Sequence, residues 1–259
     1  GAGSDLASLI TTATRQGDEF VVSGQKIWTT WAHFADWMFC LVRTDPNATK
    51  KQHGISFLLV DMKMPGVVVR PFELMSETHE VNEVYLDEVK VPVENLVHEE
   101  NDGWTVAKYL LGYERLLTAE VGRSKRDLAR VKQLAARDGG NISKPNSRFG
   151  DRVARVEIDL MALELTNLRF LDRLERGGRL GAEVSLLKLR GTEIQQALSV
   201  LLMEIAGPMC APARPLQSFG FDQGTANLTL HYCNHRKASI YGGSNEIQRN
   251  IIAKQALGL

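Results

Sequence analysis

Glu114 stands in an apolar stretch where a carboxylate could act as a general base. It follows Leu110 by four residues and Leu111 by three, and precedes Leu117 by three, so on a helix it would interrupt an apolar stripe. A carboxylate that faces a helix-bundle interior loses water, which raises its pKa and strengthens it as a base. The alternative is a structural ion pair. Arg115 is a poor direct partner for it, because adjacent helix residues do not face each other.

Trp28-Thr29-Thr30 is a second segment whose side chains suit a chemical task. A flat cofactor such as a flavin needs apolar surface against its ring faces and hydrogen-bond donors near its polar edge. A tryptophan followed by hydroxyls on one strand would supply both. The alternative is a tryptophan in a barrel core beside threonines that favour strands.

A pair of glycines near the C-terminus marks a third candidate segment, Tyr241-Gly242-Gly243-Ser244-Asn245-Glu246. Glycines let the backbone approach a bulky group, and the helix predicted to follow would offer unpaired N–H groups to an anion. A plain turn between two helices is the alternative interpretation.

The elements that must position these residues change type along the chain. Residues 19–23, 37–43, 55–60 and 66–69 are rich in β-favouring residues, with turns predicted at Gly24-Gln25 and at Pro65. Strands joined by turns without intervening helices predict a small antiparallel barrel or sandwich.

From about residue 101, apolar residues recur at helical spacing. The pattern covers residues 104–134, 153–174, 184–205 and 228–240, with joints at Asp138-Gly139-Gly140, Gly177-Gly178 and Gly207-Pro208. This predicts an antiparallel four-helix bundle with a short terminal helix. The expected fold class is α+β, with a β domain over residues 1–100 and a helical domain over residues 101–259.

Composition excludes several classes of function. The 31 basic and 31 acidic residues cancel, which argues against nucleic acid or an anionic membrane as the main partner. Three cysteines without metal-ligand spacing indicate neither a disulfide framework nor a zinc site, and no metal is expected. No apolar run reaches the roughly 18 residues that span a bilayer.

Several motifs follow one another along the chain: Gly1-Ala2-Gly3-Ser4-Asp5, Gly24 to Ala32, Asn82-Glu83-Val84, Val91-Pro92, Asn101-Asp102-Gly103-Trp104, Arg148-Phe149-Gly150 and the C-terminal glycine segment. Taken together and in this order, they resemble the acyl-CoA dehydrogenase family of flavoenzymes. The resemblance extends over essentially all 259 residues and implies a β domain followed by a helical bundle. It also implies a fragment, because members of the family open with an N-terminal helical domain.

The resemblance implies α,β-dehydrogenation of an acyl-CoA with FAD as cofactor and an electron-transfer flavoprotein as electron acceptor. In the family, the residue matching Trp28 packs on the flavin, and the one matching Thr30 bonds near its reactive nitrogen. The residue matching Ser4 lies between flavin and thioester. The expected cofactor-binding residues are Trp28, Thr29, Thr30, Ser244, Asn245 and Glu246, and the expected substrate-binding residues are Ser4, Arg115, Tyr241 and Gly242.

The catalytic base departs from the commonest pattern of the family. Most members carry a glutamate directly after the tyrosine of the C-terminal motif, where this chain has Gly242. A minority branch, which includes isovaleryl- and long-chain-type enzymes, places the base at the position that matches Glu114. We therefore expect Glu114 to be the base.

The region that would hold the ADP part of a neighbouring flavin also departs from the family. Asn146 stands in place of an arginine, Glu157 in place of a glutamine, and Glu204 opens the turn that ends in Gly207-Pro208. Two added carboxylates would repel a pyrophosphate. This predicts an α2β2 assembly with a sister subunit, as in the large subunit of pimeloyl-CoA and steroid side-chain dehydrogenases, although a homo-oligomer stays open.

Two other functions remain open from the sequence. One is a flavin monooxygenase or oxidase of the same fold, and the other is a non-catalytic partner subunit. The resemblance favours a bacterial cytoplasm and leaves the mitochondrial matrix open. Acyl chain length, branching and ring content are not readable from these residues.

Overall fold

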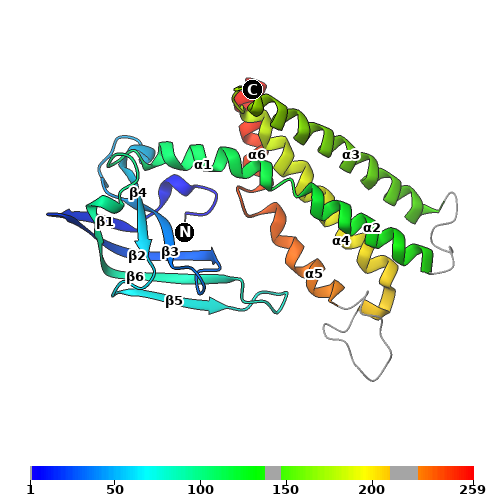
Figure 1. Cartoon of the computed structure of the whole chain (residues 1–259), viewed down its shortest axis with the longest axis horizontal. Coiled ribbons are helices and arrows are strands. Elements are labelled where there is room, and N and C mark those ends of the chain that lie inside the picture. The colour runs from blue at the N-terminus through cyan, green and yellow to red at the C-terminus, as the bar shows by residue number, and fades with distance from the viewer. Residues whose placement is uncertain (1, 138–146, 211–226) are drawn as a thin grey trace. The chain divides into compact units, whose positions relative to one another are not determined.

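The computed structural model describes residues 2–137, 147–210 and 227–259. The chain divides into two compact units, Gly1–Leu111 and Gly112–Leu259, and each is described by itself. Figure 1 shows the strands in the first unit and the packed helices in the second. Helix α1 (Gly103–Leu117) begins in the first unit and ends in the second. The domain boundary expected at residue 100 stays a prediction.

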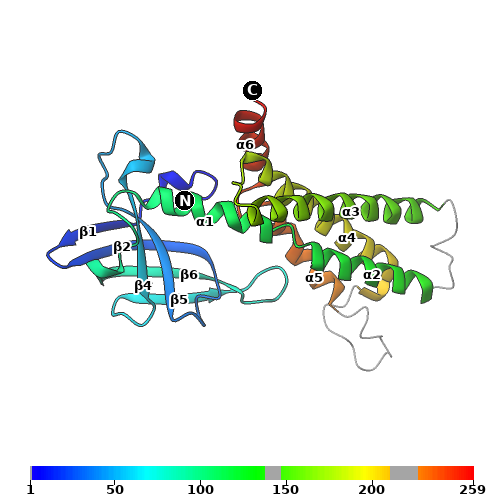
Figure 2. The same cartoon turned by 45° about the horizontal axis from the view of Figure 1, so that its top comes forward.

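Six strands form one open sheet in the first unit. Its order is β4-β3-β1-β2-β6-β5, and every neighbouring pair is antiparallel except β1 with β3. The two long strands β2 and β6 run side by side (Figure 2). The predicted β domain is therefore confirmed. The strands are β1 (Thr12–Gln16), β2 (Glu19–Thr30), β3 (Trp37–Arg43), β4 (Ile55–Asp61), β5 (Val67–Phe72) and β6 (Val81–Pro92).

One face of the sheet forms the core of this unit. Phe20 on β2 pairs with Val91 on β6, and Val22 pairs with Val89. All four side chains are fully buried. Successive residues of a strand point to opposite faces, so this two-residue period places them together on the inner face.

The turn predicted at Gly24-Gln25 is wrong, because β2 continues through both residues to Thr30. The pairing with β6 shifts between Val22 and Gly24, so this part of the strand contains a bulge. Gly24 has φ +149°, and a Cβ there would lie 2.8 Å from the Cα of Thr11. The glycine is thus required by close backbone contact inside the sheet and not by a chain reversal.

The second unit is helical after α1. Helices α2 to α5 run in alternating directions through the unit (Figures 1 and 2). The helices are α2 (Val121–Arg137), α3 (Arg148–Glu175), α4 (Ser185–Ala206), α5 (Leu228–His235) and α6 (Asn245–Ile251), with short 3₁₀ turns at Ala182–Val184, Gly207–Cys210 and Arg236–Ser239.

Helix α4 lies at the centre of this unit. It packs against α2, α3, α5 and α6. Leu187, Leu198, Leu201 and Leu202 on α4 are essentially buried, as expected for a helix surrounded by others. The predicted helical bundle is confirmed. Among the described residues, no helix combines the length and the apolar character that a membrane crossing requires.

The first predicted helix, residues 104–134, is in fact two helices. The chain leaves the helix after Leu117 and starts the next at Val121, with Glu120 at φ +44°. At this break Ala119 is buried against α4, where a Cβ on Gly191 would lie 2.8 Å from the carbonyl oxygen of Ala119. Helix α5 also ends earlier than predicted, at His235, and continues as a 3₁₀ turn.

Candidate functional site

Glu114 lies on α1, three residues before that helix ends at Leu117. Its side chain is half-buried, and Tyr113 and Leu117 are 44% and 78% exposed. Leu116, in contrast, packs against the bundle core. Helix residues two positions apart point in different directions, so Glu114 and Leu116 lie on different sides of α1. The expectation that Glu114 faces the bundle interior stays a prediction.

The glycine turn of the C-terminal motif lies next to the end of α1. A Cβ on Gly242 would be 3.7 Å from Cγ2 of Thr118, whose backbone N–H donates to the carbonyl oxygen of Glu114 at 3.0 Å. Burial and the nearby Glu120 carboxylate raise the pKa of Tyr241. The structure thus brings Tyr241 and Gly242 close to the helix end that carries Glu114.

The glycine pair is required by the local backbone. Gly242 and Gly243 have φ +63° and +79°, which disfavour residues with a Cβ. Nε2 of Gln248 donates to both glycine carbonyls at 3.3 Å. A glutamate in place of Gly242 would have to adopt a strained left-handed conformation. The absence of a base at this position therefore agrees with the backbone geometry.

Ser244 and Asn245 have structural partners. The Ser244 hydroxyl caps α6 by accepting from the N–H of Ile247 at 3.4 Å. Asn245 is buried, and its Oδ1 accepts from Nζ of Lys188 at 2.9 Å and from the Thr192 hydroxyl at 3.1 Å. Burial lowers the pKa of Lys188 to about 8. These bonds attach the motif to α4, and a cofactor contact by either residue stays a prediction.

Glu246 stands in the first turn of α6 and is exposed. Hydrogen bonds from its own backbone N–H and from the Ser244 hydroxyl lower the pKa of Glu246. A carboxylate here already compensates the positive end of the helix dipole. This weakens the case for an external anion at the same helix end, and the assignment of Glu246 to a cofactor stays a prediction.

Trp28 is a surface residue on β2. Its side chain is 61% exposed, so the barrel-core alternative is wrong. The backbone has φ +64° at Trp28, inside a shift of pairing register between Lys26 and Thr29. The indole meets the Phe72 ring edge-on, with ring centroids 5.1 Å apart. The irregular strand therefore presents a large aromatic ring to the outside.

The two threonines after Trp28 differ in exposure. Thr29 is half-buried, and its carbonyl oxygen accepts from Nδ2 of Asn82 at 2.8 Å. Oδ1 of the same asparagine lies 2.9 Å from Nδ1 of His33. Thr30 is exposed at the end of the strand. The backbone at this end of β2 is therefore held by Asn82, while the Thr30 side chain remains accessible in this unit.

Other predicted site residues have less definite positions. Ser4 is exposed in the first unit. The side chain of Arg115 and the whole of Asn146 lie outside the described residues. The roles assigned to these three residues stay predictions.

The two unusual carboxylates of the expected ADP region are paired with cations of the same chain. Glu157 accepts from Lys132 at 2.5 Å, and Glu204 pairs with Arg152. Their negative charge is therefore partly neutralised, which weakens the repulsion argument made from the sequence. Glu157 and Glu204 still stand where the family has glutamines, and a carboxylate accepts hydrogen bonds but donates none.

One cluster of titratable residues was missed from the sequence. Asp127 on α2 meets His231 and His235 on α5 inside the helical unit. The four-residue spacing of the two histidines was the available signal, because it places both on one helix face.

Comparisons with known sequences and structures identify relatives of the whole chain. Acyl-CoA dehydrogenase FadE29 of Mycobacterium tuberculosis is 38% identical over 99% of this chain and 65% of its own length. Acyl-CoA dehydrogenase IpdE1 of the same organism is 35% identical over 100% of this chain and 64% of its own length. The chain thus spans about two thirds of the length of these curated relatives.

Solved structures give the same result. A structure titled Tcur3481-Tcur3483 steroid ACAD matches 100% of this chain and 66% of its own, with TM-score 0.87 and 32% identity. The ChsE4-ChsE5 complex from Mycobacterium tuberculosis matches with TM-score 0.81 and 33% identity, over 100% of this chain and 66% of its own. Residues 1–89 match the acyl-CoA dehydrogenase middle domain and residues 101–257 its C-terminal domain. The chain therefore belongs to the acyl-CoA dehydrogenase family.

Proposed function

We propose that this chain catalyses α,β-dehydrogenation of an acyl-CoA thioester with FAD, and that Glu114 removes the α-proton. The observation that carries the proposal is the position of Glu114 at the end of α1, where Gly242 approaches Thr118. Gly242, at the position that holds the base in most members, is a glycine in the left-handed conformation. The carboxylate of Glu114 lies one helical turn before Thr118 and can take its place. Family membership supports the reaction class.

The β unit offers a surface that fits a flavin. Trp28 presents an exposed indole from a strained backbone position, and such outliers gather at functional sites. Thr30 is exposed two residues further on and offers a hydroxyl donor. In this proposal Trp28 packs on the isoalloxazine and Thr30 bonds to its edge. FAD would supply the acceptor for the hydride that leaves the β-carbon.

The role of Glu114 is to take one proton. When the α C–H bond breaks, its electron pair forms the α,β double bond as the β-hydrogen departs with its own pair. The exposed Tyr113 and Leu117 beside Glu114 are apolar surface that an acyl group could cover. Covering them would remove water from the carboxylate and raise its basicity.

We also propose that the chain works with a sister subunit and accepts a bulky acyl group such as a steroid-derived one. Two compared structures are titled as two-component assemblies, and one of them as a steroid ACAD. On α3, Ile158, Met161 and Leu165 are 65%, 59% and 63% exposed, so this helix has an apolar outer face. Electron transfer to an electron-transfer flavoprotein stays a prediction.

The test is flavin bleaching by a panel of acyl-CoAs that includes steroid-derived thioesters, with the chain prepared alone and co-expressed with a sister subunit. In Glu114→Gln we expect bound flavin to be retained and the bleaching rate to fall by about 10²- to 10⁴-fold, the usual contribution of a general base. Glu175→Gln, an exposed carboxylate at the end of α3, is the control and should bleach like the wild type.

Unchanged bleaching in Glu114→Gln would contradict the assignment of the base. Bleaching in neither protein while flavin is bound, together with oxygen consumption, would favour the oxidase or monooxygenase alternative. Failure to bind flavin in any assembly would favour a non-catalytic partner subunit.

A further inference from the structure

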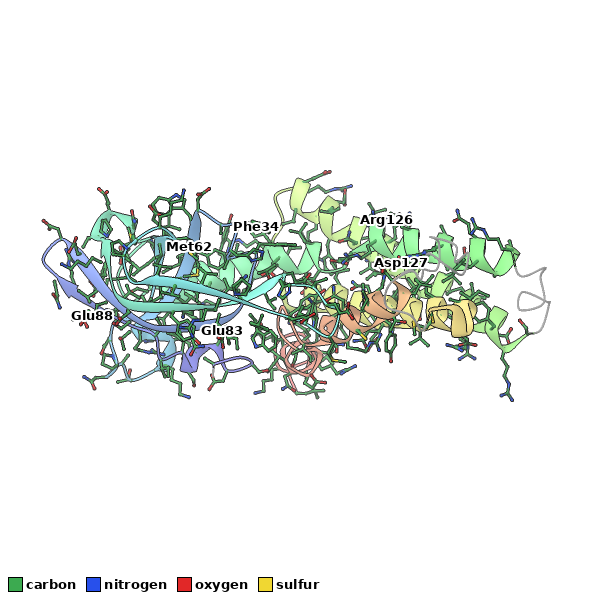
Figure 3. The ribbon with its side chains drawn as sticks, turned by 90° about the horizontal axis from the view of Figure 1, so that it is seen from below. Phe34, Met62, Glu83, Glu88, Arg126 and Asp127 are labelled. Atoms are coloured by element: carbon green, nitrogen blue, oxygen red, sulfur yellow. The ribbon has the colours of Figure 1, made fainter. Side chains whose placement is uncertain are left out.

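Asp127, His231 and His235 form a polar cluster between α2 and α5. Their possible ligand atoms all lie within 4.8 Å of one another. Asp127 and His235 are 9% and 7% exposed, and the His231 side chain is 19% exposed. Figure 3 shows Asp127 on the side of α2 nearer to α5, whereas Arg126 points to the outer side. Three groups that commonly bind metals are therefore enclosed in the helical unit.

Two atoms of this cluster lack hydrogen bonds. Oδ2 of Asp127 and Nε2 of His231 face each other at 3.4 Å, yet within the described part of the chain neither makes a hydrogen bond. Buried polar atoms normally have a partner. A tetrahedral zinc ion binds nitrogen and oxygen at about 2.0–2.2 Å, so two of its ligands lie about 3.3–3.6 Å apart. The observed separation fits two ligands of one such ion.

His235 is oriented as metal-binding histidines usually are. Nδ1 of His235 lies 2.8 Å from the carbonyl oxygen of His231, and a donor there leaves Nε2 with a free lone pair. The two rings are stacked, with centroids 4.1 Å apart and planes 17° apart. Cys233 stands midway between them in sequence, and helical geometry directs it to another face of α5.

Charged groups around the cluster act on a bound cation in both directions. Arg123 and Arg130 lie near both Asp127 and His231 and oppose an added cation. Glu120 pairs with Arg123 at 2.8 Å and offsets part of this opposition.

We propose that Asp127, His231 and His235 bind a zinc-type divalent ion that joins α5 to α2. One carboxylate and two imidazoles are a donor set typical of zinc and other divalent first-row transition metals, and less suited to magnesium or calcium. Three protein ligands leave a fourth position for water or another donor. The site uses none of the residues assigned to dehydrogenation, so the metal-site proposal is tested independently of that activity.

The experiment measures Zn²⁺ binding to the metal-free 259-residue chain by calorimetry and thermal melting, with Co²⁺ as a spectroscopic probe. We expect one ion per chain, a higher melting temperature and an intense tetrahedral Co²⁺ spectrum. Asp127→Asn, His231→Gln and His235→Gln should each weaken binding by more than about 100-fold, beyond the 10- to 100-fold typical of groups that only orient a ligand.

Two control variants should bind like the wild type. His98→Gln removes an exposed histidine that pairs with Asp102 at 2.9 Å, and Cys233→Ser removes the nearest thiol in sequence. The proposal is overturned if the wild type binds no Zn²⁺, if the three ligand variants bind as tightly as it does, or if only Cys233→Ser loses binding. Circular dichroism checks that each variant is folded. If a variant is unfolded, the Co²⁺ spectrum of the wild type still tests the site.

Discussion

At Gly243 a methyl group would be strained by the backbone and would displace the Gln248 side chain. The residue has φ +79°, and a Cβ would lie 2.5 Å from Nε2 of Gln248, which donates to the Gly243 carbonyl. This single position therefore combines backbone strain with a side-chain clash. It fixes the turn that carries Tyr241 and Gly242 next to the end of α1.

We expect Gly243→Ala to lower the free energy of unfolding by about 1–3 kcal/mol, because the methyl group adds a clash to the strain of positive φ. Gly177→Ala is the matched control. Gly177 has φ +77° with nothing within 4 Å of its Cβ position, so that variant adds strain alone. Urea denaturation measures both, and equal losses would contradict a role for the Gln248 contact.

At the scale of elements, a buried lysine connects α4 to α6. Lys188 is fully buried, donates to Asn245 and has a pKa lowered to about 8, mainly by burial. Glu246 is the nearby charge that acts against this shift. The link holds the C-terminal motif on the central helix of the bundle.

Lys188 makes stability depend on pH in a defined direction. Between pH 8 and pH 10.5 the unfolded chain keeps the proton that the folded chain has released, so stability rises with pH in this window. From pH 7 to pH 10 the wild type should gain roughly 1–3 kcal/mol relative to Lys188→Met. Lys125→Met, on an exposed ion pair with Glu164, should not change this dependence. Parallel curves for wild type and Lys188→Met would refute the assignment.

At the scale of the whole molecule, the outer face of α3 is an apolar surface that the described part of the chain leaves uncovered. Ile158, Met161, Leu165 and Leu168 recur at helical spacing and are 65%, 59%, 63% and 52% exposed. If a sister subunit covers this face, as proposed, the leucines of α3 contribute to the free energy of association and little to the free energy of folding.

Leu165→Glu should therefore weaken association with a co-expressed sister subunit by about tenfold or more, while the melting temperature of the isolated chain stays the same. Arg155→Glu changes charge on α3 away from the centre of the apolar face and is the control. Analytical ultracentrifugation measures both. Undiminished association of Leu165→Glu would exclude this face as the interface.

Local patterns in the sequence were sufficient to predict the main strands and helices. Two-residue and three-to-four-residue periods depend only on which neighbours share a face, so Phe20 and Val22 mark a strand and the leucines of α4 mark a buried helix. The glycine at position 242, and with it the search for another base at Glu114, is likewise visible in the sequence alone.

Only the tertiary structure decided the features that depend on distant residues. The break after α1 lies where Ala119 meets Gly191 on α4, and the bulge of β2 lies where Gly24 meets Thr11. The partial burial of Glu114 and the meeting of Asp127 with His231 also depend on how the helices pack. Local periodicity contains no information on which remote backbone comes close, and close approach is what moves these residues away from their expected environments.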